Sequence, residues 1–291
     1  MVTIIGAAIG SGGRDIKAAE GPDVIARSEG FQKCLDEGLH LNWKTTIDEH
    51  QHPDKLELLR LTLESLASEI KKLAEKKHYF CTIGGDHSAA IGTWTGAALG
   101  AGEPIGLIWV DAHKDAHTFE TTPSGNLHGM PVAVLLGEGD ERYTHLLSHS
   151  PSPRILPQNI CLVGVRSFEE GESLLLKRLG VRVFDMDEVN KKGIQAVMKE
   201  AREHVLKHAK VYGITLDLDS MDPVDAPAVS TPEPNGIHSE ELLQVLKDLS
   251  SDKNQMGFEI MEFNPSNDIA GKTEALVIRL LRILAEGRKD E

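Results

Sequence analysis

Short apolar runs alternate along the chain with longer segments in which apolar residues recur at helical spacing. Several of the short runs are rich in valine and isoleucine and carry almost no alternation, which is typical of strands buried on both faces of a parallel sheet. The predicted strands cover residues 2–5, 79–83, 105–110, 160–165, 181–184, 211–218 and 258–261.

The clearest helix prediction covers residues 53–77. Its apolar positions form one stripe, and we expect Pro53 in its first turn. The stripe consists of Leu56, Leu59, Leu63, Leu66, Ile70 and Leu73. Further helices are predicted near residues 87–99, 169–179, 193–208, 238–249 and 272–286. This βα alternation predicts an α/β fold, a single three-layer αβα domain over residues 1–291 with a central, mostly parallel sheet.

Composition narrows the range of partners. The 291 residues include 45 Asp and Glu against 31 Lys and Arg, a net charge of -14. This acidity argues against nucleic acid and anionic membrane surfaces as partners, because phosphate binding needs clustered basic residues. Three widely separated cysteines predict no disulfide framework. With no apolar run of membrane-spanning length and no leader pattern, we expect a cytoplasmic protein.

Asp and His residues gather at the carboxyl ends of three predicted strands, where ligands bind in such sheets. One group follows residue 83, one follows residue 110, and one ends the strand at 211–218. Residues two apart in a strand point the same way, so these side chains are expected to converge. The predicted cluster is His87, Asp111, His113, Asp115, Asp217 and Asp219.

Four carboxylates packed together repel one another unless cations lie between them. Two divalent ions would balance the four charges, and oxygen ligands with two imidazoles suit Mn²⁺ better than Zn²⁺. Two metals can also position one water as a nucleophile. A single Asp or His of this kind is usually a helix cap or a satisfied polar residue. Three groups at three strand ends favour a metal centre.

Two other motifs carry less weight. The glycine-rich run at residues 6–13 lacks a clean GxGxxG pattern, so we interpret it as a flexible loop rather than a phosphate site. A Ser–His–Asp hydrolase based on residues 86–88 is excluded, because sequence neighbours cannot form a catalytic triad.

Five motifs resemble the ureohydrolase (arginase and agmatinase) family, and within it the bacterial arginases. They are GGDHS at 84–88, DAHKD at 111–115, SGNLHG at 124–129, DLDSMDP at 217–223 and EIMEFNP at 259–265. The resemblance covers about residues 3–282 and implies the arginase-like fold and two Mn²⁺ per subunit. One ion would take His87, Asp111, Asp115 and Asp217. The other would take Asp111, His113, Asp217 and Asp219.

The resemblance also implies a mechanism, in which a metal-bridging hydroxide attacks the guanidinium carbon and urea is released. Asp115 would hold the hydroxide, Glu262 would face the guanidinium, and His128 would carry protons. The expected substrate is small and cationic. Its implied contacts are His117, Ser124, Asn126, Glu169, Glu172 and Thr231.

The substrate is less clear than the family. Ser124 and Asn126 match contacts to an amino-acid carboxylate, which favours L-arginine and the products L-ornithine and urea. His117 and Glu169 stand where arginases usually have Asn and Asp, and the TPEP segment at 231–234 is closer to agmatinases. Agmatine or another guanidino acid is therefore the alternative substrate.

Two further hypotheses stay open: a Zn²⁺ amide hydrolase of the histone-deacetylase kind, and a catalytically silent metal-binding or assembly protein. The first would hold one metal ion rather than two. The resemblance also implies a homo-oligomer, either a trimer or a hexamer.

Overall fold

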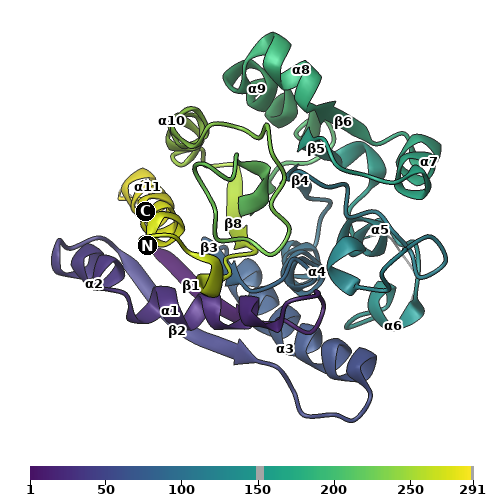
Figure 1. The fold of residues 1–291 in the computed structure, drawn as a ribbon, viewed down its shortest axis with the longest axis horizontal. Coiled ribbons are helices and arrows are strands. Elements are labelled where there is room, and N and C mark those ends of the chain that lie inside the picture. Colours follow the sequence, from purple (N-terminus) through teal and green to yellow (C-terminus); the bar gives the residue numbers. More distant parts are fainter. Residues whose placement is uncertain (149–153, 290–291) are drawn as a thin grey trace.

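The carboxyl ends of eight parallel strands lie along one edge of a central sheet (Figure 1). The computed structural model describes residues 1–148 and 154–289. Within them the strand order is β2-β1-β3-β8-β7-β4-β5-β6, and every neighbouring pair is parallel. The strands are β1 (Val2–Ala8), β2 (Leu41–Asp48), β3 (Phe80–Gly84), β4 (Gly106–Val110), β5 (Ile160–Val165), β6 (Arg182–Asp185), β7 (Tyr212–Asp217) and β8 (Gln255–Met261).

Helices cover both faces of this sheet, so the predicted three-layer α/β fold is confirmed (Figure 1). One face packs against α3 (Lys55–Glu75), α4 (Ala89–Ala101), α5 (Pro131–Leu135), α6 (Glu141–Thr144) and α7 (Glu170–Leu179). The other packs against α1 (Gly21–Arg27), α2 (Glu29–Asp36), α8 (Met186–Lys192), α9 (Ile194–Val205), α10 (Ser239–Leu249) and α11 (Lys272–Gly287). Residues 149–153 and 290–291 of the predicted domain lie outside the described residues.

The predicted leucine stripe lies on α3, and all of it except the partly buried Leu56 belongs to the core that α3 and α4 form on one face of the sheet. The two helices approach closely, because a Cβ atom added at Gly96 would lie 2.3 Å from the carbonyl oxygen of Ala67. The prediction for Pro53 is wrong. Asp54 is the N-cap of α3 and accepts hydrogen bonds from the backbone nitrogens of Leu56 and Glu57, so the proline precedes the helix.

The sheet differs from the sequence prediction at β2, and the strand alternation used to predict the site does not apply to two of its carboxylates. Strand β2 was not predicted, because it is an edge strand whose residues are mostly polar and only partly buried. Asp111 and Asp219 lie beyond the ends of their strands. Asp111 follows β4, and Asp219 lies in a 3-10 turn that spans Leu218–Ser220. Turns, rather than strand alternation alone, therefore bring these carboxylates together.

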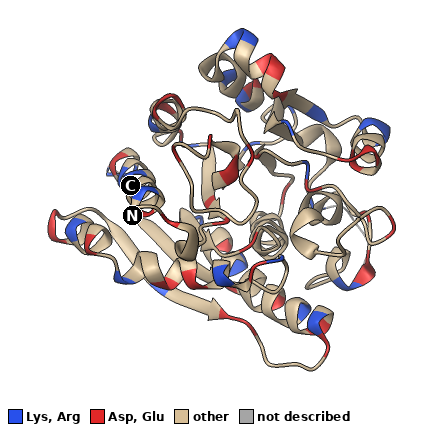
Figure 2. Ribbon diagram, viewed as in Figure 1, with Lys and Arg blue, Asp and Glu red and all other residues tan. Residues whose placement is uncertain are grey.

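Charge is distributed unevenly between the surface and the interior. Basic and acidic bands are mixed on the peripheral helices, as Figure 2 shows. Within the described residues, no helix is long and apolar enough to cross a membrane. Several acidic side chains are buried, most of them near the carboxyl edge of the sheet. The buried acidic groups among the described residues are Asp86, Asp111, Asp115, Glu172, Asp217, Asp219, Glu259 and Glu262.

Candidate metal centre and substrate pocket

His87 is held rigidly just beyond the end of β3. Its ring stacks on Trp109 with centroids 4.3 Å apart, and its Nε2 lies 3.1 Å from Thr215 Oγ1. The Thr215 hydroxyl donates to Glu259 Oε2 at 2.6 Å, so its oxygen is left to accept a hydrogen from His87 Nε2. The other ring nitrogen, Nδ1, is therefore the one that can act as a ligand.

This Nδ1 atom faces three buried carboxylate oxygens. They belong to Asp111 at 3.1 Å, Asp115 at 3.2 Å and Asp217 at 2.9 Å. Within the described chain Nδ1 has no hydrogen-bond partner. A nitrogen lone pair directed at three carboxylates is stable only if a cation lies between them. The arrangement therefore fits a bound metal ion.

A second group of donors surrounds His113. Its Nδ1 lies 3.1 Å from Asp219 Oδ2 and 3.5 Å from Asp111 Oδ1. Asp111 thus presents one oxygen to each group, as a carboxylate that bridges two ions would. Within each group, the donor atoms lie close enough together to hold one ion. Asp217 joins the His87 group through the contact above, and its predicted bridging role stays a prediction.

The pKa shifts of these side chains also fit bound cations. Burial and the nearby Asp111 raise the pKa of Asp115 to about 7. Burial, followed by the charges of Asp219 and Asp111, raises the pKa of Asp217 well above its usual range. Burial alone would lower the pKa of His87, but the surrounding carboxylates raise it well above the usual imidazole value. Without a metal the centre would have to bind protons instead.

His128 and Glu262 form an ion pair beside the metal groups, with Nδ1 and Oε1 3.1 Å apart. Burial lowers the pKa of His128, but the Glu262 carboxylate outweighs it and raises this pKa to about 9. The second carboxylate oxygen, Oε2, is buried without a hydrogen-bond partner among the described residues. Glu262 has a φ of 66° and Asp115 a φ of 47°. Both values lie in the left-handed region, which residues other than glycine rarely adopt.

A cavity of about 260 Å³ opens above the two groups. It brings together all six predicted substrate contacts and five of the six predicted ligands, since Asp111 lies beneath it. Its lining consists of Arg14, His87, His113, Asp115, His117, Pro123, Ser124, Asn126, His128, Gly129, Glu169, Glu172, Asp217, Asp219, Thr231 and Glu262. The metal, catalytic and substrate roles of these residues remain predictions.

The two residues that depart from the arginase pattern contact each other. His117 Nε2 lies 2.9 Å from Glu169 Oε2 and 3.5 Å from Glu172 Oε2. Glu172 is fixed in turn, because it accepts hydrogen bonds from the backbone nitrogens of Ala116 and Glu169. The His117 ring therefore already has a carboxylate partner, Glu169, within the protein.

Sequence reasoning missed several residues that shape the site. Thr215 and Glu259 support His87, yet both look like ordinary strand residues. Asp86 was left without a role. Its Oδ2 accepts hydrogen bonds from the backbone nitrogens of Gly12 and Gly13 at 2.8 and 3.0 Å. The glycine-rich run predicted as a flexible loop is therefore partly the end of β1 and partly a segment held against the site.

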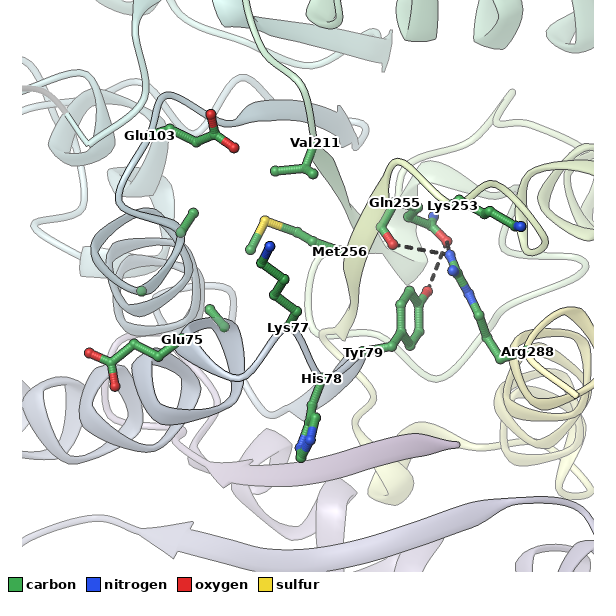
Figure 3. Close-up of a pocket in the computed structure, with 13 residues that line it drawn as sticks. Glu75, Lys77, His78, Tyr79, Glu103, Val211, Lys253, Gln255, Met256 and Arg288 are labelled. Carbon is green, nitrogen blue, oxygen red and sulfur yellow. Dashed lines mark hydrogen bonds between the residues drawn. The ribbon is translucent and has the colours of Figure 1, made fainter. Parts of the chain in front are cut away.

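A separate cavity of about 440 Å³ lies at the opposite edge of the sheet, near the amino ends of β3, β7 and β8 (Figure 3). The predicted site residues do not line it. Arg288 donates to the carbonyl oxygen of Gln255 and packs over the ring of Tyr79 (Figure 3). It also donates to the carbonyl oxygen of Asp252. These contacts fix the end of α11 to the sheet, which is a structural role.

Comparisons with known proteins agree with this geometry. The model of the arginase family matches residues 1–285. The arginase of Bacillus subtilis is 39% identical over 221 residues, which cover 76% of this chain and 73% of that protein. Human arginase-1 is 37% identical over 218 residues, or 74% of this chain and 66% of that protein.

Solved structures extend the likeness to nearly the whole chain. The crystal structure of Bacillus subtilis arginase superposes with a TM-score of 0.90 at 33% identity, covering 98% of each chain. Formimidoylglutamase of Bacillus subtilis, at 22% identity and a TM-score of 0.81, shares the fold. The chain belongs to the arginase family and is an arginase-type ureohydrolase.

Proposed function

We propose that the protein is a Mn²⁺-dependent arginase, which hydrolyses L-arginine to L-ornithine and urea. The observation that carries this proposal is the pair of His and Asp groups sharing Asp111 beneath a pocket with polar groups at its mouth. Related arginases from Bacillus support it. Imidazole and carboxylate donors without a thiolate suit Mn²⁺. Two such ions would supply Lewis acidity and activate a water molecule.

Side chains of the protein would bind the substrate, orient the water and transfer protons. The guanidinium group of the substrate would lie against the Glu262 carboxylate, whose free Oε2 can accept its hydrogen bonds. Asp115 would orient the attacking water by accepting a hydrogen bond. His128, which contacts Glu262, would hold a proton and deliver it to the departing amine.

The experiment is a urea-release assay on the Mn²⁺-loaded protein with L-arginine, agmatine and 4-guanidinobutyrate. We expect urea from L-arginine, loss of activity in Asp115→Asn, and normal activity in Asp23→Asn, whose carboxylate pairs with Arg27 on the surface. Urea from agmatine but none from L-arginine would establish the alternative substrate. The His117–Glu169 contact is the observation that favours this alternative, because it occupies the two positions at which arginases usually have the Asn and Asp that bind the amino-acid end.

Three further properties are also proposals, and of these only the oligomeric state rests on the family resemblance alone. They are one ureohydrolase domain over residues 1–291, a trimer or hexamer, and a cytoplasmic location. Light scattering on the purified protein tests the oligomeric state, and a monomeric mass would contradict it.

A further inference from the structure

The pocket carries one strongly basic side chain, Arg14, among many acidic ones. Six of its lining residues are Asp or Glu, and Arg14 is the only Lys or Arg in the described lining. Arg14 is exposed, so it lies at the mouth of the pocket rather than beside the metal groups. A positive charge at this place opposes the entry of a cationic substrate unless the same substrate also carries an anionic group.

The backbone on both sides of Arg14 is fixed. Gly12 and Gly13 donate to Asp86, and the Asp15 carboxylate accepts hydrogen bonds from Asn264 Nδ2 at 2.8 Å and from the backbone of Lys17 at 3.0 Å. A side chain at Gly12 would overlap Ser88 Oγ, at 2.3 Å, so the segment packs tightly. The Arg14 side chain therefore extends from an anchored backbone.

Its guanidinium group has no ion-pair or hydrogen-bond partner within residues 1–148 and 154–289. The side chain of Glu169, which is 58% exposed, lines the same pocket without pairing with Arg14. Ser124 and Asn126 line it as well. The mouth thus presents an unpaired guanidinium group, two neutral polar groups and a carboxylate, which complement a carboxylate and an ammonium group on one ligand.

We infer that Arg14 binds the carboxylate of the substrate and thereby selects guanidino compounds that carry a carboxylate over guanidino amines. A guanidinium group can bind a carboxylate through two parallel hydrogen bonds, which a lysine cannot reproduce. The inference rests on the proposed function and deepens it, because it supplies a reason for L-arginine to be preferred over agmatine.

The test compares Arg14→Gln and Arg14→Lys with the wild-type enzyme on L-arginine and agmatine. Arg14→Gln is expected to lower kcat/KM for L-arginine about tenfold, mainly through KM, because the contact forms before the reaction begins. Agmatine should react as well as before or better. Arg14→Lys should fall between. Lys17→Gln removes a nearby positive charge outside the pocket and controls for a general electrostatic effect.

A binding measurement separates failure of this inference from failure of the proposed function. Calorimetry with the products L-ornithine and putrescine needs no turnover, and Arg14→Gln should weaken only L-ornithine. Equal effects on both ligands, or no effect, would overturn the assignment of Arg14. A wild-type protein that binds L-ornithine through Arg14 but releases no urea would overturn the proposed function alone. Failure of the wild type to bind L-ornithine would overturn both.

Discussion

Replacing Thr215 by valine removes one hydroxyl group and leaves the shape of the side chain nearly unchanged. That hydroxyl joins His87 Nε2, at 3.1 Å, to Glu259 Oε2, at 2.6 Å. After the substitution His87 loses the acceptor that keeps its Nδ1 available for a metal. Glu259, whose pKa burial already raises, loses a donor and keeps the one from Trp94.

Two independent estimates give the size of the effect. Loss of an outer hydrogen-bond partner of a metal ligand typically weakens metal binding about 10- to 100-fold, or about 1.4–2.7 kcal/mol. One hydrogen bond to a charged group contributes about 1.5–3 kcal/mol. We therefore expect Thr215→Val to lower metal affinity by one to two orders of magnitude, at the site that contains His87.

The assay is a two-site titration of the metal-free protein with Mn²⁺ by calorimetry, with urea denaturation of the metal-free protein as a measure of folding. Thr95→Val is the matched control, because Thr95 is buried in α4 and its hydroxyl has no hydrogen-bond partner among the described residues. If Thr215→Val binds both ions as tightly as the wild type, or if Thr95→Val weakens binding equally, the reasoning is wrong.

Three further predictions concern stability. Burial raises the pKa of Asp252, but hydrogen bonds from Arg202, the Asn254 backbone and Tyr212 together outweigh it and hold the pKa below the ordinary carboxyl value. The carboxylate therefore stabilises the fold above about pH 3.9 and loses this effect as pH falls through its lowered pKa. In urea denaturation, Asp252→Asn should be less stable than the wild type at pH 7, with a gap that narrows below about pH 4; a constant gap would contradict the electrostatic origin. Gly213→Ala should destabilise by about 1–3 kcal/mol or more in the same assay, since its Cβ would lie 2.0 Å from the ring of Trp94. Unchanged stability would show that the ring can move aside. Chelation of metal should lower the Tm and added Mn²⁺ should restore it, because an ion that binds only the folded state stabilises that state. If neither treatment changes the Tm, the result argues against the metal centre.

The sequence predicted the architecture well because buried parallel strands leave a direct signature. Runs such as 160–165 are apolar throughout, since both faces of β5 are covered. The edge strand β2 has no such signature, because solvent contacts part of it and its residues are mostly polar. Short helices such as α5 were not predicted for another reason, because five residues are too few to show a helical period.

The candidate site was predictable where residues directly follow buried strands of the sheet. It was unpredictable where a residue reaches the site through side-chain contacts that no local pattern indicates. His87 and Asp111 follow buried strands, so their meeting at one edge follows from topology. Arg14 reaches the same pocket because Asp86, more than seventy positions away, fixes the backbone before it. No local pattern encodes that contact. The mutual contact of His117 and Glu169 likewise appears only once side chains are placed.

The left-handed backbone at Asp115 and Glu262 has a consequence for how variants of this enzyme behave. A non-glycine residue in this conformation costs about 1–2 kcal/mol, and both residues also place a buried carboxylate among others. Glycine at Asp115 would relieve the strained torsion and part of the repulsion from Asp111, while removing a predicted metal ligand. In the metal-free protein, such a substitution would cost little stability or even improve it. In the absence of metal, selection for thermal tolerance alone would therefore erode the predicted metal centre, whereas metal binding and turnover would retain it.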